Sequence, residues 1–434
     1  MSLNCTSVEL LAPLDAELAA VVSNPSHPLA SLSVLAIRDG RIVYQRQFGQ
    51  RFIDPVRPAN NRPADQDTLY RVASISKLVT ALGVMKLVED GKLSLDADVS
   101  ALLGYELRNP RFPDRPISLR MLLSHTSSLR DAAGYSWDAR HSLREVLLPG
   151  GLLHGAGAMW ASSAPPGSEF SYCNLNSGVI AALMEKATGE RFDRLMKRLI
   201  LDPMGLHGGF HPADFSAADL RNLATLYRKR SDIDGKEIWN SAGPWIAQVD
   251  DYSRDAPVPR AGPEYLLGSN GTLMSPQGGL RVSAADLGKI MLMLMNQGKH
   301  DGRRILKAEI LTTMFAEYWR HDGRRNSADN YQGLFHAWGL GNQHFLDISA
   351  AGRGDRLVDG GGFTGVGHLG DAWGLTAAFV LDPARRNGFI YLIGGPGTDP
   401  ATYPGLYSSR YRYEELIMTA LYRRAILGTD SLQR

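Results

Sequence analysis

A serine and a lysine stand three positions apart in the stretch "YRVASISKLVTALGVMKLVEDG", as Ser74 and Lys77. Apolar residues recur at helical spacing after Ser74, which predicts a helix that begins there. Side chains at i and i+3 share one helix face, so the lysine amine can reach the serine hydroxyl. The pattern therefore permits a serine nucleophile with a lysine base, provided that burial lowers the pKa of the lysine.

A second interpretation of this pair stays open at this point. Ser-x-x-Lys occurs by chance in many proteins, and Ser74 could simply cap the helix while Lys77 points to water. Another cluster, "FSYCNLNSG", places Tyr172 and Asn174 just before a predicted helix. Taken alone, it is also typical of a buried tyrosine followed by a capping asparagine. A third segment, "GHLGDAWGLTAAFVLDP", carries a His-x-Gly that leads into a strand.

Length and composition limit the functions that are possible. The 434 residues suffice for one large or two ordinary domains. Lys and Arg total 47 against 45 Asp and Glu, a net charge of +2, which argues against nucleic acid or an anionic membrane as a partner. Cys5 and Cys173 lie outside any Cys/His cluster, so we expect no metal, no cofactor and no disulfide framework.

The apolar runs are too short to span a bilayer, which predicts a soluble protein without membrane insertion. The first residues, "MSLNCTSVELLAPLDAEL", have neither a charged start nor a hydrophobic core, so no export signal is visible. The sequence as given predicts a cytoplasmic protein. If a leader was trimmed, a periplasmic or secreted location is expected instead.

Strand-forming runs occur at both ends of the chain. Asp39-Gly40 joins two of them in a predicted hairpin, and a second hairpin turns around residues 383–387, with a predicted helix outside each. We therefore expect an α+β fold in which an antiparallel sheet is flanked by helices. Its discontinuous α/β domain comprises 1–95 and 277–434, and a mainly helical domain, 96–276, is inserted.

The three motifs together resemble the serine β-lactamase and penicillin-binding-protein superfamily, in particular its class C-like branch with family VIII carboxylesterases and D-stereospecific peptidases. The family motifs Ser-x-x-Lys, Tyr-x-Asn and Lys/His-Thr-Gly match, in this order, Ser74 with Lys77, Tyr172 with Asn174, and His368, Leu369 and Gly370. Further similar segments follow the family's order along the chain: "ISLRMLLSHTSSL" from Ile117, "LDPMGL" from Leu201 and "GGLRVSAADLGKIMLMLMNQGKHDGRRIL" from Gly278.

The resemblance implies a β-lactamase/transpeptidase-like fold with the active site in a cleft between the two parts. Ser74 would become acylated, while Lys77 and Tyr172 would share the roles of general base and proton donor. As a base, the tyrosine needs a lowered pKa, for which the lysine ammonium would be the cause. Asn174 would hold the lysine and the acyl amide of the substrate. The backbone N–H groups of Ser74 and Asp371 would form the oxyanion hole.

One departure from the family pattern bears on the substrate. His-Leu-Gly replaces Lys-Thr-Gly, which removes the permanent cation and the hydroxyl that bind a substrate carboxylate, although His368 can still hydrogen-bond Tyr172. We therefore expect a serine hydrolase, a carboxylesterase of small or medium esters with an uncharged ester or amide as its partner. The alternatives are a D-amino-acid peptidase or D-Ala-D-Ala carboxypeptidase, a β-lactamase, and a catalytically silent relative that binds peptides.

Three other features have competing interpretations. "GVGHLG" satisfies GxGxxG, but a strand is predicted after it where a dinucleotide site needs a helix. "FTG" at 363–365 is a second possible register for the strand motif, less favoured because the spacing from His368 to Asp382 fits the family better. For His125 we expect a turn-stabilising role over that of a catalytic base.

The segment 207–265 is polar, rich in turn residues and too long for a simple connection. The composition of this segment is equally compatible with two interpretations, a surface decoration and a lobe over the cleft. If it overhangs the site, we expect Trp239, Trp245 and Tyr252 to form an apolar wall for the acyl or alcohol group.

Overall fold

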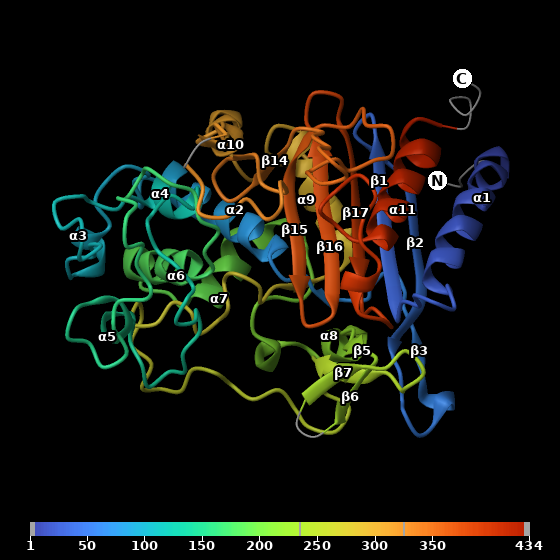
Figure 1. Ribbon diagram of the computed structural model, residues 1–434, viewed down its shortest axis with the longest axis horizontal. Coiled ribbons are helices and arrows are strands. Elements are labelled where there is room, and N and C mark those ends of the chain that lie inside the picture. The colour runs from blue at the N-terminus through green and yellow to red at the C-terminus, as the bar shows by residue number, and fades with distance from the viewer. Residues whose placement is uncertain (1–4, 234–235, 324–325, 429–434) are drawn as a thin grey trace.

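The fold is built around a nine-stranded sheet in which every neighbouring pair is antiparallel. The computed structural model describes residues 5–233, 236–323 and 326–428 (Figure 1). From one edge to the other, the strands are β12 (Trp319–Arg320), β13 (Ala337–Trp338), β14 (Gln343–Phe345), β15 (Gly365–Ala372), β16 (Leu375–Asp382), β17 (Asn387–Ile393), β1 (Ser31–Arg38), β2 (Arg41–Phe52) and β3 (Arg62–Pro63).

Both ends of the chain contribute to this sheet. β1 pairs with β17 in a register that sets Leu32 opposite Ile393. Both predicted hairpins are confirmed, and Asp39 and Gly40 have φ angles of 52° and 73°, as a two-residue turn with a left-handed backbone requires. The α+β prediction is therefore confirmed, whereas the domain boundaries at 95/96 and 276/277 stay a prediction.

Helices cover both faces of the sheet (Figure 1). On one face lie α1 (Cys5–Val22) and α11 (Arg412–Ala420), and on the other lie α2 (Ile75–Glu89) and α9 (Ala284–Met295). Successive strand residues point to opposite faces, so Val34 packs in one core and Leu35 in the other, both fully buried. This double burial explains why the central strands are apolar at nearly every position.

The part of the chain beside the sheet is mainly helical (Figure 1). Its helices are α3 (Ser100–Leu103), α4 (Leu119–Leu123), α5 (Leu143–Leu147), α6 (Leu175–Thr188) and α7 (Phe192–Met196), while α8 (Ala217–Asn222) and α10 (Ala308–Phe315) come later in the chain. Within the described ranges, no helix has the length and apolar character that crossing a membrane demands. The predicted helices after Ser74 and Asn174 are confirmed as α2 and α6.

Short two-stranded sheets complete the structure. β4 (Tyr70–Arg71) pairs with β9 (Arg281–Val282) directly before the start of α2. The segment 207–265 contains α8 and two small ladders: β5 (Leu226–Arg228) with β8 (Ile246–Val249), and β6 (Arg230–Ile233) with β7 (Lys236–Trp239). A last pair, β10 (Lys299–His300) with β11 (Arg303–Arg304), follows α9.

Candidate active site

Ser74 lies at the start of α2, but its side chain does not cap the helix. Its backbone is already helical, with φ −68° and ψ −10°, and its hydroxyl accepts no hydrogen bond from the first turn. The preceding Ala73 has a φ of 45°, a left-handed conformation that is uncommon for a residue with a side chain. Such strain is typical of functional positions, and the helix-cap interpretation of Ser74 is not supported.

Lys77 is buried, with 4% of its surface exposed, and its amine lies against Ser74. Its Nζ is 3.0 Å from Ser74 Oγ, 2.7 Å from Asn174 Oδ1 and 3.0 Å from the carbonyl oxygen of Gln277. Burial lowers the pKa of Lys77 to about 7, although the charge of Asp131 opposes this shift. A large fraction of the amine is then neutral at pH 7, with a lone pair available for the serine proton.

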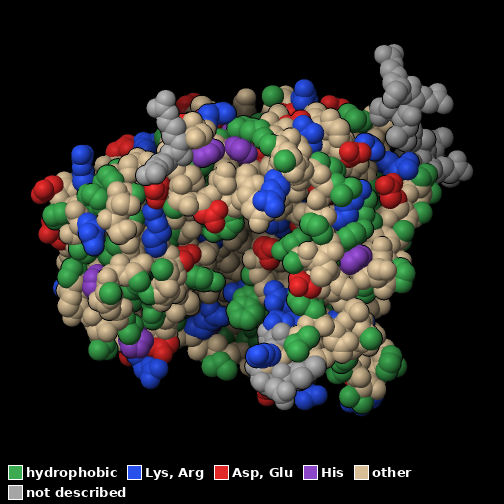
Figure 2. All heavy atoms as spheres, viewed as in Figure 1, with side chains coloured by type: hydrophobic (Ala, Val, Ile, Leu, Met, Phe, Trp, Pro, Cys, Tyr) green, Lys and Arg blue, Asp and Glu red, His purple; other side chains and the backbone are tan. Residues whose placement is uncertain are grey.

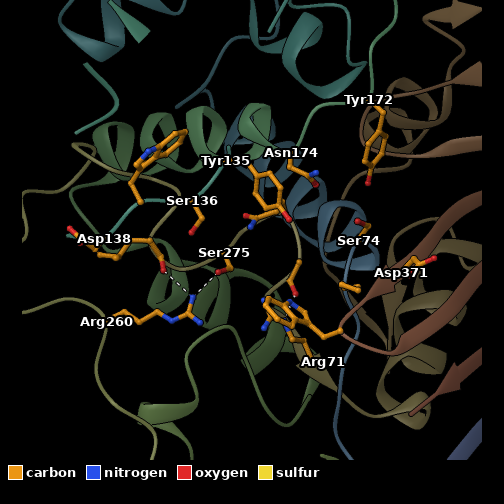
Figure 3. Close-up of a pocket in the computed structure, with 17 residues that line it drawn as sticks. Arg71, Ser74, Tyr135, Ser136, Asp138, Tyr172, Asn174, Arg260, Ser275 and Asp371 are labelled. Carbon is orange, nitrogen blue, oxygen red and sulfur yellow. Dashed lines mark hydrogen bonds between the residues drawn. The ribbon is translucent and has the colours of Figure 1, made fainter. Parts of the chain in front are cut away.

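Tyr172 approaches the same hydroxyl from the segment before α6, and its phenol oxygen points toward Ser74 (Figure 3). The Nζ of Lys77 lies 4.8 Å from the centre of its ring. Burial raises the pKa of Tyr172, and the Ser74 hydroxyl offsets only part of this. The expectation of a lowered tyrosine pKa is wrong, because the lysine lies over the ring and is itself only partly charged. A phenol that keeps its proton is suited to donate it.

The Asn174 amide is fixed between Lys77 and a carboxylate that sequence reasoning missed, that of Asp131. Asp131 Oδ2 accepts from the Asn174 backbone N–H and from Asn174 Nδ2, both at 2.8 Å. Asp131 Oδ1 accepts from the Leu175 backbone N–H at 3.0 Å and so caps α6. With Nδ2 held by a carboxylate, the amide oxygen must face Lys77. One of the two Nδ2–H groups of Asn174 is therefore already used, which leaves one for the acyl amide of a substrate.

His125 anchors the Tyr172 segment. Its Nδ1 lies 3.1 Å from the Cys173 backbone nitrogen and 3.2 Å from Asn176 Nδ2, and its backbone oxygen accepts from the Ser171 N–H at 2.8 Å. The centres of the His125 and Tyr172 rings are 4.6 Å apart. These contacts agree with the turn-stabilising role predicted for this histidine.

Strand β15 brings the third motif to the site. A Cβ on Gly370 would lie only 2.6 Å from the carbonyl oxygen of Val72, so only glycine lets the strand approach the segment before Ser74 so closely. The competing register is not supported, because Phe363 is buried in the core on the α1 side. "GVGHLG" lies within β15 itself, which agrees with its rejection as a dinucleotide site.

His368 is buried beside the site in a neutral form. Burial, followed by the charge of Lys77, lowers its pKa to about 3. Its Nδ1 lies 2.6 Å from the Leu369 carbonyl oxygen, while Nε2 has no partner among the described residues. The ring centres of His368 and Tyr172 are 6.2 Å apart, and the expected hydrogen bond between them is absent from the described contacts.

Ser74 and Asp371, whose backbone N–H groups are predicted to form the oxyanion hole, both line the cavity beside the nucleophile. In the described chain, the Ser74 N–H meets no acceptor. β14 pairs with β15 only as far as Gly367, which leaves the edge from His368 to Ala372 without a strand partner on that side. Asp371 lies on this edge and lines the cavity, and its carboxylate faces Arg410 at 4.0 Å.

These residues open into a cavity of about 720 Å³. The face in Figure 2 is hollowed between the helical part and the sheet, with Lys and Arg side chains along the lower edge. The aromatic lining consists of Tyr135, Trp137 and Trp373 together with Tyr172. The expected wall of Trp239, Trp245 and Tyr252 is wrong, since none of the three lines this cavity and the 207–265 segment contributes Arg260 instead.

The described residues include no group of three or more His, Cys, Asp or Glu side chains that could hold a metal ion. Sequence reasoning missed Asp131, Gln277 and Arg260. Asp131 follows the "HTSSL" motif by two positions, which is the one signal that could have marked it.

Comparison with known proteins gives a family and a fold. The family model described as Beta-lactamase matches residues 14–406. Esterase EstB of Burkholderia gladioli is 35% identical over 229 residues, 49% of this chain and 56% of that protein. The D-alanyl-D-alanine-carboxypeptidase/endopeptidase AmpH of Escherichia coli K12 is 28% identical over 180 residues, 40% of this chain and 43% of that protein.

Among solved structures, EstCE1, described as a hydrolase with promiscuous acyltransferase activity, superimposes with a TM-score of 0.61. The superposition covers 96% of this chain and 99% of that one at 20% sequence identity, which supports the fold alone. The chain spans about half of the length of the curated relatives named above.

Proposed function

Because this chain belongs to the Beta-lactamase family, we propose that it is a serine hydrolase that forms an acyl-enzyme on Ser74, and that its substrates are carboxylic esters. The observation that carries the proposal is the buried Lys77 amine, 3.0 Å from the Ser74 hydroxyl and with a pKa of about 7. A solvated lysine would stay protonated at neutral pH and could not accept a proton.

In the first half of the reaction, Ser74 Oγ attacks the ester carbonyl carbon and its proton passes to Lys77 Nζ. The negative charge on the carbonyl oxygen is stabilised by the N–H groups of Ser74 and Asp371. As the intermediate collapses, the carbon–oxygen bond to the alcohol breaks. The Tyr172 phenol protonates the leaving alkoxide and recovers a proton from the lysine ammonium.

In the second half, water attacks the acyl-enzyme and loses its proton to the same relay. The ester bond to Ser74 breaks, the serine oxygen regains a proton, and the carboxylic acid leaves. Asn174 takes no part in bond breaking in this scheme. It holds the Lys77 amine in line with Ser74 through the 2.7 Å hydrogen bond to its Oδ1.

Two observations support an ester over the alternatives. Of the two relatives named above, EstB has the higher sequence identity to this chain, 35% against 28% for AmpH. In addition, His368 and Leu369 supply neither a permanent cation nor a hydroxyl at the position where β-lactamases have both. The similarity to AmpH keeps D-amino-acid peptidase activity as the second candidate, since the same relay can cleave an amide.

The test is turnover of p-nitrophenyl acetate and butyrate by the wild type and by Ser74→Ala, together with labelling by a fluorophosphonate. We expect turnover and labelling only in the wild type. If both proteins are inert and Ser74 is not labelled, the chain is a silent binder and the proposal fails. Equal activity in both proteins would place the chemistry elsewhere.

A further inference from the structure

The catalytic cavity contains two guanidinium groups, those of Arg71 and Arg260, that meet no carboxylate in the described chain. Arg71 is 8% exposed, and its Nε donates to the Gly278 carbonyl oxygen at 3.0 Å. Arg260 Nη1 donates to Ser275 Oγ at 2.7 Å and to the Leu273 carbonyl oxygen at 3.3 Å. Their remaining N–H groups have no protein acceptor within the described residues.

A third arginine nearby shows what a carboxylate does to such a group. Arg281 is paired with Asp250 through contacts of 3.0 and 2.7 Å. Burial by itself lowers the pKa of Arg281, but Asp250 outweighs burial and the net pKa is raised. Burial, and then the charge of Arg281, lowers the pKa of Arg71 to about 10 and also lowers that of Arg260. Of the three arginines Arg71, Arg260 and Arg281, only Arg281 is paired with the Asp250 carboxylate.

The two acidic residues that line the cavity are occupied elsewhere. Asp138 forms an ion pair with Arg140 at 2.6 Å, outside the cavity lining. The Asp371 carboxylate faces Arg410 at 4.0 Å. The cavity therefore keeps an uncompensated positive charge on the side of Arg71 and Arg260.

We propose that Arg71 and Arg260 form a carboxylate subsite, so that the enzyme prefers esters that carry a carboxylate group apart from the bond to be cleaved. This inference rests on the proposed ester hydrolysis and revises the expectation of an uncharged substrate. The cation missing from strand β15 is replaced by two guanidinium groups supplied by β4 and by the 207–265 segment.

The chemistry of the subsite fits a carboxylate. Guanidinium groups present paired N–H donors that match its two oxygens. Arg260 lies across the cavity from Ser74 (Figure 3), so the carboxylate must be several bonds away from the scissile carbonyl. This arrangement favours a substrate with an acid group at its far end, on either the acyl or the alcohol side.

Trp373 closes the subsite at the cavity mouth. Its ring lies 5.9 Å from Arg71 Cζ, its surface is 51% exposed, and its φ of 58° is left-handed. This φ is what the two-residue turn between β15 and β16 requires, because Ala372 pairs with Leu375. The turn thereby holds the Trp373 ring at the rim of the cavity. An apolar ring here excludes water from one side of the guanidinium, which strengthens contact with an anion.

The experiment compares matched acidic and neutral esters. For the acyl side, monomethyl adipate and monomethyl pimelate are set against methyl hexanoate and methyl heptanoate. For the alcohol side, 4-acetoxybenzoate is set against 4-acetoxybenzamide. We expect the wild type to show a higher kcat/KM for the acidic member of at least one pair, and the preference to weaken as ionic strength rises.

The variants are Arg260→Gln, Arg260→Lys and, as a matched control outside the cavity, Arg320→Gln. We expect Arg260→Gln to reduce the acid-to-neutral ratio of kcat/KM by about tenfold or more, because a hydrogen-bonded charge is lost. Its turnover of the neutral esters should persist. Arg260→Lys should keep most of the preference, and Arg320→Gln all of it.

Two results would overturn the subsite: a wild type that turns over neutral esters at least as well as acidic ones, or a ratio unchanged in Arg260→Gln. Fluorophosphonate labelling of Ser74 shows that each variant is folded. If Arg260→Gln does not fold, Arg71→Gln is used in its place for the same comparison. Failure of the proposed function is distinguishable, since the wild type would then cleave none of the esters and take no label.

Discussion

The Nζ of Lys77 lies 3.0 Å from the Oγ of Ser74 in a site where the lysine is almost completely buried. This contact makes the lysine the first candidate for the acylation base. Burial lowers its pKa to about 7, so the basic form increases as pH rises through neutrality.

The first prediction concerns the pH profile of the reaction. We expect kcat/KM for p-nitrophenyl butyrate to rise with pH and to level off above an apparent pKa of about 7, since the neutral lysine is the active form. Lys77→Arg should lose activity at every pH up to 9, because arginine stays protonated. A profile that is flat from pH 5 to 9 would exclude the lysine as the base.

The second prediction separates the roles of Lys77 and Tyr172. Because burial raises the pKa of Tyr172, we expect it to donate a proton to the leaving group. Tyr172→Phe should then lower kcat about 100-fold or more for an ethyl ester, whose alkoxide needs protonation. For a p-nitrophenyl ester, which releases a stable anion, kcat should fall much less. Equal losses for both esters would instead identify the tyrosine as the base.

The third prediction concerns Asp131, which neither touches Ser74 nor lines the cavity itself but contacts the lining residue Asn174. Its charge raises the pKa of Lys77 and its oxygens orient Asn174. Asp131→Asn should lower kcat and move the rising limb of the pH profile to lower pH. The exposed Asp114→Asn serves as the control and should leave the profile unchanged. Lower activity without any shift of the profile would indicate a purely structural role.

The fourth prediction uses two glycines near Ser74. A methyl group on Gly370 would lie 2.6 Å from Val72 O, whereas one on Gly278 would have its nearest neighbour at 3.7 Å. Gly370→Ala should lower the free energy of unfolding by about 1–3 kcal/mol and abolish turnover. Gly278→Ala should leave the free energy of unfolding, measured in urea, nearly unchanged. Similar stabilities of the two variants would contradict the close approach of β15.

The fifth prediction concerns stability in acid. His368 has a pKa of about 3 in the folded protein, whereas an unfolded histidine titrates near 6.5. Between these values the unfolded chain binds the extra proton, so the free energy of unfolding falls as pH falls from about 7 to 4. His125, whose pKa burial also lowers, adds to the same trend. His368→Asn should flatten this slope in urea unfolding, and an unaltered slope would contradict the buried neutral ring.

The sequence was informative where local spacing determines geometry. Ser74 and Lys77 share a helix turn, and Tyr172 and Asn174 directly precede another helix, so their proximity within each pair follows from the chain itself. The hairpin at Asp39-Gly40 was predictable for the same reason. Each of these features depends on residues only a few positions apart.

The remaining features depend on residues distant in the chain. The pKa of Tyr172 follows from burial among aromatic side chains of the last third of the chain, such as Phe335 and Trp338. Periodicity cannot show such contacts. Composition alone points to aromatic residues of the 207–265 segment as the cavity wall, yet Tyr135 and Trp137 occupy that place.

The pairing of β1 with β17 has a consequence for how the protein is made. Residues 31–38 leave the ribosome long before their partner strand at 387–393 is made. Until then, β1 and its hairpin partner β2 have an open edge, and the sheet against which α2 packs is incomplete. A nascent chain stalled before residue 387 therefore carries the nucleophile without the strand arrangement that shapes its site, and the emergence of β17 sets the earliest point at which the enzyme can become active.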